Sequence, residues 1–322
     1  MLDRIRKPVE KEMEEFNGLL ADCLRNENTS VSSVINYVFE KRGKQMRPLL
    51  VLLTAALHGT INRKSYIGAV LAELTHAASL IHDDIIDDAY IRRGKLSVNA
   101  IWRSKIAVLT GDYVLARAMS LAVNNNAADL LAVIIDSFEK LSEGELIQME
   151  HASRLDMNEA QYFETINKKT ASLLGSCAAL GARSVGSSED NIENMRLFGE
   201  YLGMAFQIKD DILDLSRDNN TGKPALKDIK DRKVTLPLLI LLNNSDERNK
   251  KKIIGLLSGV KYKEENAETI HKMILNSDSI EKTAATMHEF IRKASDIIER
   301  YDDSEVKTSL KLYMDFIMER DK

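Results

Sequence analysis

Residues that interrupt regular secondary structure are scarce in this sequence. Only 4 of its 322 residues are proline and 15 are glycine, against about 5% and 7% in a typical soluble protein. This shortage argues against a turn-dense sandwich, a collagen and a low-complexity chain. The length would allow two domains, but no linker or shift in composition divides the chain, so we expect a single domain over residues 1–322.

Cysteine is also rare. The two thiols, Cys23 and Cys177, cannot form a disulfide framework or a closed zinc site by themselves. Cys177 lies in an apolar segment, where a buried thiol acts as a small hydrophobic side chain. We therefore expect neither structural disulfides nor structural zinc.

An excess of one charge and a long apolar run are missing as well. The chain has 45 basic and 49 acidic side chains and a net charge of -4, so no global field would recruit nucleic acid or an anionic membrane. The longest apolar run, residues 48–57, is half of the ~20 residues that a membrane-spanning helix needs. Residues 1–10 mix charges from the start, without the apolar segment of a secretory signal. We expect a cytoplasmic protein with no integral membrane segment and no nucleic-acid partner.

Helical periodicity dominates what is present. Apolar residues recur at spacings of three and four over most of the chain, whereas the alternation typical of strands is hard to find. The sequence therefore predicts an all-α protein. The predicted helices cover residues 31–40, 67–88, 105–123, 127–150, 159–182, 190–215, 235–243 and 280–300. Residues 216–234 are the longest polar stretch with glycine and proline, and this predicts a mobile loop.

Two acidic segments share one pattern. Residues 81–87 and 208–214 both read Ile-x-Asp-Asp-Ile-apolar-Asp, 127 residues apart. At roughly 100° per residue, the three carboxylates of each segment lie on one narrow face of a helix. They are Asp83, Asp84 and Asp87 in the first segment and Asp210, Asp211 and Asp214 in the second.

Converging carboxylates need a positive partner. Each acidic segment follows an apolar run, so a solvated acidic face does not explain both. Like charges about 4 Å apart repel by ~4 kcal/mol at an effective dielectric constant of 20, and a hard cation relieves this repulsion. Mg²⁺ takes one or two carboxylates and completes its shell with water and substrate phosphate, which implies a phosphate ester or a diphosphate as substrate. Calcium storage is less favoured because no twelve-residue loop with a central glycine is present.

Basic residues near these segments could contact such a substrate. Each alone is more often a solvated surface charge, but together they supply the arginine forks and lysine charges that bind phosphate. They are Lys44, Arg47, Arg92, Arg93, Lys168, Lys169, Lys223, Lys227 and Lys233.

With these motifs the sequence strongly resembles the trans-type polyprenyl diphosphate synthases over about residues 40–240. The matching motifs are Gly43-Lys44-x-x-Arg47-Pro48, both Asp-Asp-x-x-Asp segments, Arg92-Arg93-Gly94, Gly111-Asp112-Tyr113, Lys169-Thr170 and Phe206-Gln207. The resemblance implies an all-α, single-domain bundle of roughly antiparallel helices around a deep central cavity, usually in a homodimer. Residues 244–322 would form a helical remainder with no assigned chemistry.

The resemblance also implies roles for individual residues. The six aspartates would hold about three Mg²⁺ ions against the diphosphate of an allylic substrate. That diphosphate would also contact Arg92, Lys169, Lys233 and, as a loop closes, Lys223. Isopentenyl diphosphate would be bound by Lys44, Arg47, His76 and Arg93. Thr170 and Gln207 would face the reacting carbons.

The implied reaction is a repeated, Mg²⁺-dependent condensation of isopentenyl diphosphate with an allylic primer, for which farnesyl diphosphate is expected. The growing chain would descend along the helix of the first acidic segment. Thr75, Ala78 and Ser79 lie one to two turns upstream, and they are small where short-chain members of the family have a bulky floor. We therefore expect a product of about six to ten isoprene units, with octaprenyl diphosphate as the best single choice.

Two positions depart from the family pattern. Leu226 and Arg232 stand in the polar loop where the family often has glycine. Both bear on how that loop closes, while the motifs for the chemistry are intact.

Other functions remain as alternatives. A short-chain farnesyl or geranylgeranyl diphosphate synthase would share every motif. A class I terpene cyclase would need a different second metal motif, and a metal-dependent phosphohydrolase would need further histidines in register. A noncatalytic subunit of a heterodimeric synthase would typically lack one acidic motif, whereas both are complete here.

Overall fold

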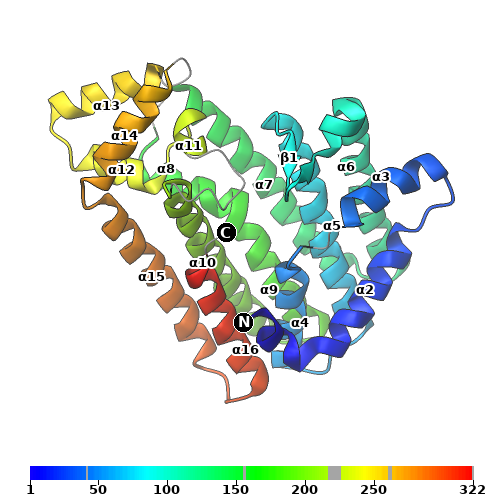
Figure 1. The fold of residues 1–322 in the computed structure, drawn as a ribbon. Helices are drawn as coiled ribbons and strands as arrows, with labels where there is room; N and C mark the ends of the chain where they lie inside the picture. Colours follow the sequence, from blue (N-terminus) through cyan, green and yellow to red (C-terminus); the bar gives the residue numbers. More distant parts are fainter. Residues whose placement is uncertain (41–42, 155–156, 217–225, 260–262, 321–322) are drawn as a thin grey trace. The chain divides into compact units, whose positions relative to one another are not determined.

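The computed structural model describes residues 1–40, 43–154, 157–216, 226–259 and 263–320. Within them the only strands are β1 (Ile91–Arg92) and β2 (Lys95–Leu96), so the predicted all-α class is confirmed (Figure 1). The helices are α1 (Leu2–Arg6), α2 (Glu10–Leu24), α3 (Thr29–Glu40), α4 (Met46–His58), α5 (Arg63–Ile86), α6 (Val98–Asn124), α7 (Ala128–Arg154), α8 (Glu159–Ile166), α9 (Ser172–Ser184), α10 (Glu189–Asp214), α11 (Lys227–Lys230), α12 (Leu236–Asn243), α13 (Glu247–Gly259), α14 (Glu264–Leu275), α15 (Ser279–Ile298) and α16 (Glu305–Glu319). A 3₁₀ turn, η1 (Lys7–Val9), and a π-helical turn, η2 (Asn167–Ala171), complete the elements.

Every predicted helical segment lies largely in a helix of the structure. The apolar periodicity was therefore sufficient to locate these helices. The predicted helix at 159–182 is divided into α8, η2 and α9. Part of the predicted loop at 216–234, residues 217–225, lies outside the described residues, and α11 is a short helix within the rest.

The helices group into two compact units, each assembled from separated stretches of the chain. Unit 1 comprises Met1–Phe138, Ser176–Arg196 and Tyr301–Leu312, and unit 2 comprises Glu139–Gly175, Leu197–Arg300 and Tyr313–Lys322. Neither unit is continuous in sequence. The single domain over residues 1–322 stays a prediction.

Helix α5 is the main packing element of unit 1. It contacts α2, α4 and α6, drawn in blue to cyan in Figure 1. Its N-terminus is fixed by a capping box between Asn62 and Ser65. The ring of His82 on α5 lies so close to Gly111 on α6 that any Cβ there would collide with it, so glycine permits the close approach of the two helices.

Helix α6 is unusual in unit 1 for its exposed apolar surface. Its backbone is kinked at Arg103, where φ is 69°. Among the described residues, it is the one helix long and apolar enough to cross a membrane, and 33% of its most apolar stretch is buried. Length and composition alone do not assign it to a membrane, because helices of water-soluble proteins pass the same criterion.

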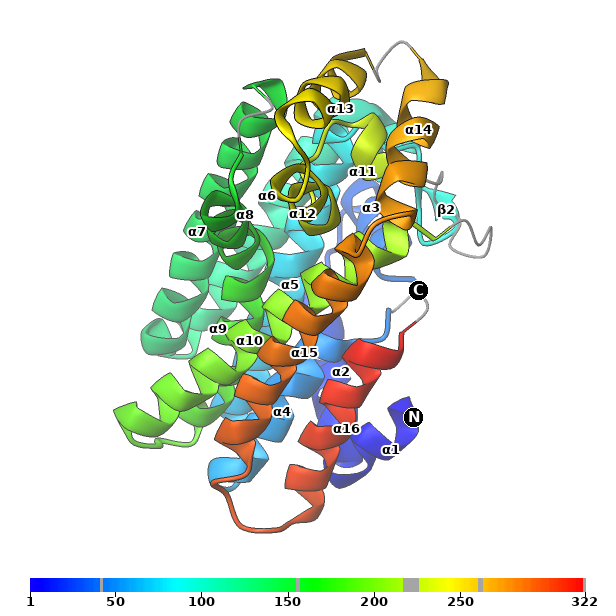
Figure 2. The same ribbon diagram turned by 90° about the vertical axis from the view of Figure 1, so that its left-hand side faces the viewer.

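Unit 2 has its own apolar core around α12, α13 and α14. Leu238, Ile253 and Ile270 are fully buried there. Helix α12 also packs on α15 (Figure 2, yellow to orange). This core supports the end of α10, where the second acidic segment lies.

Candidate active site

A hairpin directly after α5 positions two of the predicted arginines. Its strands pair antiparallel, with Arg92 opposite Lys95. The two loop residues, Arg93 and Gly94, have φ values of 51° and 73°, as a tight type I′ turn requires. The turn therefore fixes where Arg92 and Arg93 leave the backbone.

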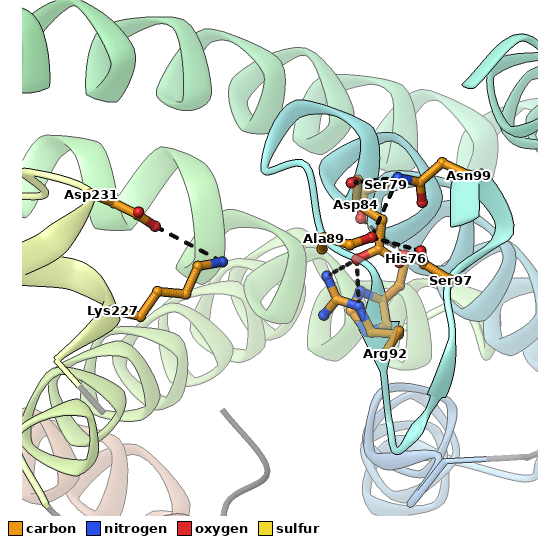
Figure 3. Close-up of polar contacts among 9 residues, drawn as sticks. All are labelled: His76, Ser79, Asp84, Ala89, Arg92, Ser97, Asn99, Lys227 and Asp231. Atoms are coloured by element: carbon orange, nitrogen blue, oxygen red, sulfur yellow. Dashed lines mark hydrogen bonds and ion pairs between the residues drawn. The ribbon is translucent and has the colours of Figure 1, made fainter. Parts of the chain in front are cut away.

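Arg92 binds Asp84 of the first acidic segment (Figure 3). The Arg92 Nη2 and Nε atoms lie 2.6 and 2.8 Å from Asp84 Oδ1. Asn99 donates to the main-chain oxygens of Asp84 and Ala89, at 3.3 Å each, and ties the end of α5 to the start of α6. Asp84 is only 5% exposed, so its carboxylate is set in a fixed, charge-paired position.

The other two aspartates of the segment are more open. Asp83 is half-buried and Asp87, which caps the C-terminus of α5, is exposed. The predicted single face is thus divided: Asp84 turns to the hairpin, and Asp83 and Asp87 lie on the accessible side of the helix.

Asp84 and the hairpin border a cavity of about 100 Å³ within unit 1, which is partly open to solvent. Its polar lining includes Glu73, His76, Asp84, Arg92 and Arg93. The structure therefore brings four of the sequence-predicted residues to one cavity.

Charge in this cavity controls the protonation of His76. Burial, with the positive charges of Arg47, Arg93 and Arg92, lowers the pKa of His76 well below its ordinary value. The ring is neutral at physiological pH. For Glu73, burial raises the carboxyl pKa, although Arg47 and Arg93 act in the opposite direction. Sequence analysis missed Glu73, yet its place one turn before His76 on an apolar helix was an available signal.

A second, apolar cavity of about 60 Å³ lies in unit 1. Thr75 lines it with Leu115, Met119, Ile134 and Phe138, from helices α5, α6 and α7. The Thr75 hydroxyl is buried and has no hydrogen-bond partner among the described residues.

The two other predicted chain-length residues are close-packed. Ala78 is 0% and Ser79 4% exposed. The Ser79 hydroxyl donates to the main-chain oxygen of His76 at 2.9 Å. Only Thr75 of the three reaches the apolar cavity.

In unit 2, Asp211 is the centre of a hydrogen-bond network. Its Oδ2 accepts from the Tyr162 hydroxyl at 2.7 Å and from the Leu236 amide at 3.1 Å. Its Oδ1 accepts from Gln207 Nε2 at 3.2 Å, and Gln207 Oε1 accepts from Thr170 at 2.9 Å. The predicted pair Thr170 and Gln207 is thus joined directly.

Burial has strong effects on this network. It raises the pKa of Asp211 to about 7, with the nearby Asp228 acting in the same direction. It also raises the Tyr162 pKa well above its ordinary value. Through its bonds to Tyr162 and Leu236, Asp211 connects the end of α10 to α8 and α12.

Asp210, its neighbour, is paired with the C-terminal part of the chain. The Arg320 guanidinium forms an ion pair with Asp210 Oδ1 and lies 3.7 Å from the centroid of the Phe206 ring. The Arg320 side chain is only 8% exposed. The charged sequence after residue 244 gave no signal for this contact.

Lys169, a predicted diphosphate-binding residue, lies in the π-helical turn η2 between α8 and α9. Lys169 forms an ion pair with Glu145 and donates to Gln148 at 3.1 Å. Its neighbour Lys168 pairs with Glu143 and Glu164 at 2.8 Å each. Single π-helical turns are frequent at functional sites, and this one displaces Lys169 and Thr170 from a regular helical register.

The remaining predicted residues lie in several environments. Lys44 is exposed and Arg47 is half-buried at the N-terminus of α4. Asp214 Oδ2 accepts from the amide of Asp228, whose main-chain oxygen accepts from the amide of Lys233.

Lys223 lies outside the described residues. The two departures from the family pattern both adopt left-handed backbone: φ is 60° at Leu226 and 59° at Arg232. A left-handed position explains why glycine suits these sites.

The donor set fits a hard metal ion. The described residues contain no group of three or more His, Cys, Asp or Glu side chains able to hold a metal by themselves. Mg²⁺ needs only one or two carboxylates when water and phosphate complete its shell. Asp83 and Asp87 on α5 and Asp210 on α10 are oxygen donors of this kind, and they are not sealed from solvent.

An all-α chain with two Asp-Asp-x-x-Asp turns and flanking arginines and lysines has the isoprenoid synthase fold. The chain belongs to the polyprenyl synthetase family, whose model matches residues 28–275. It is a prenyltransferase of the trans-polyprenyl synthase type.

Relatives agree in family and differ in product. The chain is 32% identical to the short chain isoprenyl diphosphate synthase of Methanothermobacter thermautotrophicus, over 100% of this chain and 99% of that protein. It is 32% identical to heptaprenyl diphosphate synthase component 2 of Bacillus subtilis, over 97% and 87% of the two chains. The crystal structure of a polyprenyl synthase from Caulobacter crescentus, complexed with calcium and isoprenyl diphosphate, has a TM-score of 0.93 and 29% identity, covering 100% of this chain and 98% of that one.

Proposed function

We propose that this prenyltransferase condenses isopentenyl diphosphate repeatedly with an allylic primer, farnesyl diphosphate, to give a long all-trans polyprenyl diphosphate. The observation that carries the proposal is the cavity in which His76, Arg92 and Arg93 meet Asp84 of an aspartate-rich turn. This cavity brings side chains that can bind an anion next to an aspartate that can bind a hard metal ion. The related protein solved with calcium and isoprenyl diphosphate supports the same chemistry.

The aspartates are assigned to metal-bridged binding of the primer. Asp83, Asp84 and Asp87 are assigned to the diphosphate of the primer, together with Asp210, Asp211 and Asp214. Mg²⁺, about three ions, would offset the charge that develops on the departing diphosphate. Arg92 would exchange its bond to Asp84 for one to the diphosphate, assisted by Lys169, Lys233 and Lys223.

Isopentenyl diphosphate is assigned to the residues around the start of α4. Lys44, Arg47 and Arg93 provide the positive charge, and neutral His76 can donate one ring N–H to a phosphate oxygen without being titrated. Anions are also favoured at a helix N-terminus, and α4 begins at Met46.

The bond changes follow from this placement. The allylic C–O bond breaks and its electron pair leaves with diphosphate. The alkene of isopentenyl diphosphate forms the new C–C bond, and a proton is then lost. Thr170 and Gln207 would orient their fixed dipoles toward the cationic carbons. We assign the proton to the released diphosphate, because no side chain of suitable basicity is placed for it by the sequence motifs.

The product length is proposed from the apolar cavity. Thr75 lines this cavity together with Met119 and Phe138. This apolar space is assigned to the start of the path of a growing chain of about six to ten isoprene units, with octaprenyl diphosphate preferred. Relatives carry names from geranylgeranyl to octaprenyl diphosphate synthase, so a short-chain product is the second candidate.

The partner is proposed to be a second copy of this chain. Val108, Leu109, Met119 and Val123 form a stripe of exposed apolar side chains on α6, between 42% and 63% exposed. At roughly 100° per residue they lie within about 100° of arc, and a contiguous exposed apolar face is typical of an interface. The relative named as a component of a heptaprenyl diphosphate synthase keeps a two-chain enzyme as the alternative. A cytoplasmic location stays a prediction.

One experiment separates the candidate functions. The purified protein is incubated with farnesyl diphosphate, isopentenyl diphosphate and Mg²⁺, and the products are sized. A long polyprenyl diphosphate supports the proposal, and geranylgeranyl diphosphate supports the short-chain alternative. Cyclic hydrocarbon formed without consumption of isopentenyl diphosphate, release of phosphate alone, or no turnover until another chain is added would each contradict it.

A further inference from the structure

The segment from Gly43 to Arg47 has an uncommon conformation. Gln45, which precedes α4, has φ 50° and ψ 40°, in the left-handed region, and is 9% exposed. A residue other than glycine stays there only when its surroundings determine it. Such residues cluster where a ligand must be clamped.

Two side chains from the first two helices hold this segment. Gln45 Nε2 donates to Asn17 Oδ1 at 2.9 Å, and Asn17 Nδ2 donates to the main-chain oxygen of Met13 at 2.7 Å. The second bond fixes the Asn17 amide so that its oxygen points to Gln45. Arg6 Nη2 donates to the main-chain oxygen of Lys44 at 2.7 Å.

The start of the segment, Gly43, is in contact with the hairpin. A Cβ at Gly43 would lie 2.7–2.9 Å from three atoms of the Arg93 guanidinium. Gly43 is therefore required for Arg93 to lie against the backbone. Successive residues of the segment are thus held by Arg93, Arg6 and Asn17.

We propose that Arg6 and Asn17 are positioning residues for isopentenyl diphosphate: they fix the backbone on which Lys44 and Arg47 are presented. This rests on the proposed function of that segment. Both residues precede the range that the family model matches, which begins at residue 28, so family membership does not assign them. Neither touches the reacting atoms, and each acts through main-chain geometry.

The first test measures binding without turnover. Isopentenyl diphosphate is titrated into the full-length protein in a calorimeter, in the absence of allylic substrate. Asn17→Ala and Arg6→Ala are each expected to weaken binding by about three- to tenfold, the effect of losing one hydrogen bond. Arg6→Lys keeps a donor and recovers part of the affinity.

Steady-state kinetics supplies a readout that a purely structural role would not give. Both alanine variants should raise KM for isopentenyl diphosphate while leaving KM for farnesyl diphosphate and kcat nearly unchanged. The matched controls are Arg4→Ala on α1 and Glu14→Ala on α2, both exposed, which should change neither constant.

A double-mutant cycle addresses the backbone directly. Glycine adopts a left-handed conformation without side-chain support, and Gln45→Gly also removes the donor to Asn17. Asn17→Ala should therefore have no further effect on affinity in a Gln45→Gly background. Additive losses would contradict a role through Gln45.

The outcomes separate this inference from the proposed function. If the wild-type protein does not bind isopentenyl diphosphate, the function proposed for the segment is wrong. If it binds and the folded Asn17→Ala and Arg6→Ala variants bind equally well, the function stands and the positioning role is wrong. Hydrogen exchange of the amides at 44–47, faster in the variants than in the wild type, supports the role even where the affinity loss is small.

Discussion

Arg320, the last residue that the structure describes, lies against Asp210, one of the aspartates that we propose for metal binding. Its guanidinium pairs with Asp210 and stacks on Phe206, and burial lowers its pKa. The Arg320 guanidinium is therefore a cation held at the second acidic segment.

Replacement of Arg320 should strengthen metal binding. A divalent ion at Asp210 has to displace the guanidinium, so Arg320→Gln removes a competitor and is expected to tighten Mn²⁺ binding by about tenfold, or ~1.4 kcal/mol. The free Mn²⁺ signal in electron paramagnetic resonance measures this without turnover. Arg300→Gln, at an exposed arginine, is the matched control. Unchanged or weaker binding in Arg320→Gln would refute the competition.

The aspartates of the first segment should separate into two kinds. Asp83→Ala is expected to lower turnover by roughly two or more orders of magnitude with little change in stability, because Asp83 is only half-buried and its proposed role is to hold a metal ion against the substrate. Asp84→Ala should also lower the free energy of unfolding by about 1–3 kcal/mol, since Arg92 then loses its buried partner. Urea unfolding and initial rates test both. Full activity in Asp83→Ala and in Asp210→Ala would defeat the assignment of the site.

Bulky substitutions beside the apolar cavity should shorten the product. Ala78→Phe is expected to do so at a cost in stability of about 1–3 kcal/mol, because Ala78 is fully buried. Thr75→Phe should fill the cavity more directly. Thr75→Val conserves volume and should leave the product distribution unchanged. Chromatographic sizing that finds the wild-type distribution in both Phe variants would place the growing chain elsewhere.

Protonation of His76 should lower the stability of the protein in mild acid. Its folded pKa lies below the unfolded value of about 6.5, so the unfolded state binds more protons between the two values. Stability is therefore full above about pH 6.5 and falls as the pH drops toward the folded pKa. Burial is the largest cause of the lowered pKa of His76, and the positive charges of Arg47, Arg93 and Arg92 act in the same direction.

Comparison of His76→Gln with the wild type tests whether His76 causes this fall in stability with pH. The loss of unfolding free energy between about pH 7.5 and pH 5.5, measured by urea denaturation, should be smaller in His76→Gln. An equal or larger loss in the variant would show that His76 is not the group that titrates.

A charge on the α6 stripe should abolish self-association. Leu109→Asp and Val123→Asp place a carboxylate at sites that are each 63% exposed, so they should dissociate a homodimer without unfolding the chain. Sedimentation velocity measures the change. Leu275→Asp, at an exposed leucine of α14, is the control and should remain dimeric. A wild-type monomer, or dimeric variants, would place the interface elsewhere.

Local physics explains which features sequence analysis could anticipate. The helices follow from apolar periodicity, and the spacing of Asp83, Asp84 and Asp87 on α5 follows from helical geometry. Leu226 and Arg232 were noted as departures from glycine, and both have left-handed backbone. Each of these features depends on residues close together in the chain.

Partners distant in sequence could not be anticipated in the same way. No local pattern links Arg320 to Asp210, Tyr162 to Asp211 or Asn17 to Gln45, because these contacts depend on how helices pack. The same packing buries Asp84 and Asp211 and leaves Asp83 half-buried and Asp87 exposed.

By itself, the sequence determined an all-α chain, two aspartate-rich helix ends and the set of cations that could meet a diphosphate. Only the tertiary structure decided which carboxylates are already paired, which side chains border a cavity and which residues of α1 and α2 support the segment at 43–47. Helical periodicity acts over a few residues, whereas burial and charge pairing are set by neighbours that the fold brings together from far along the chain.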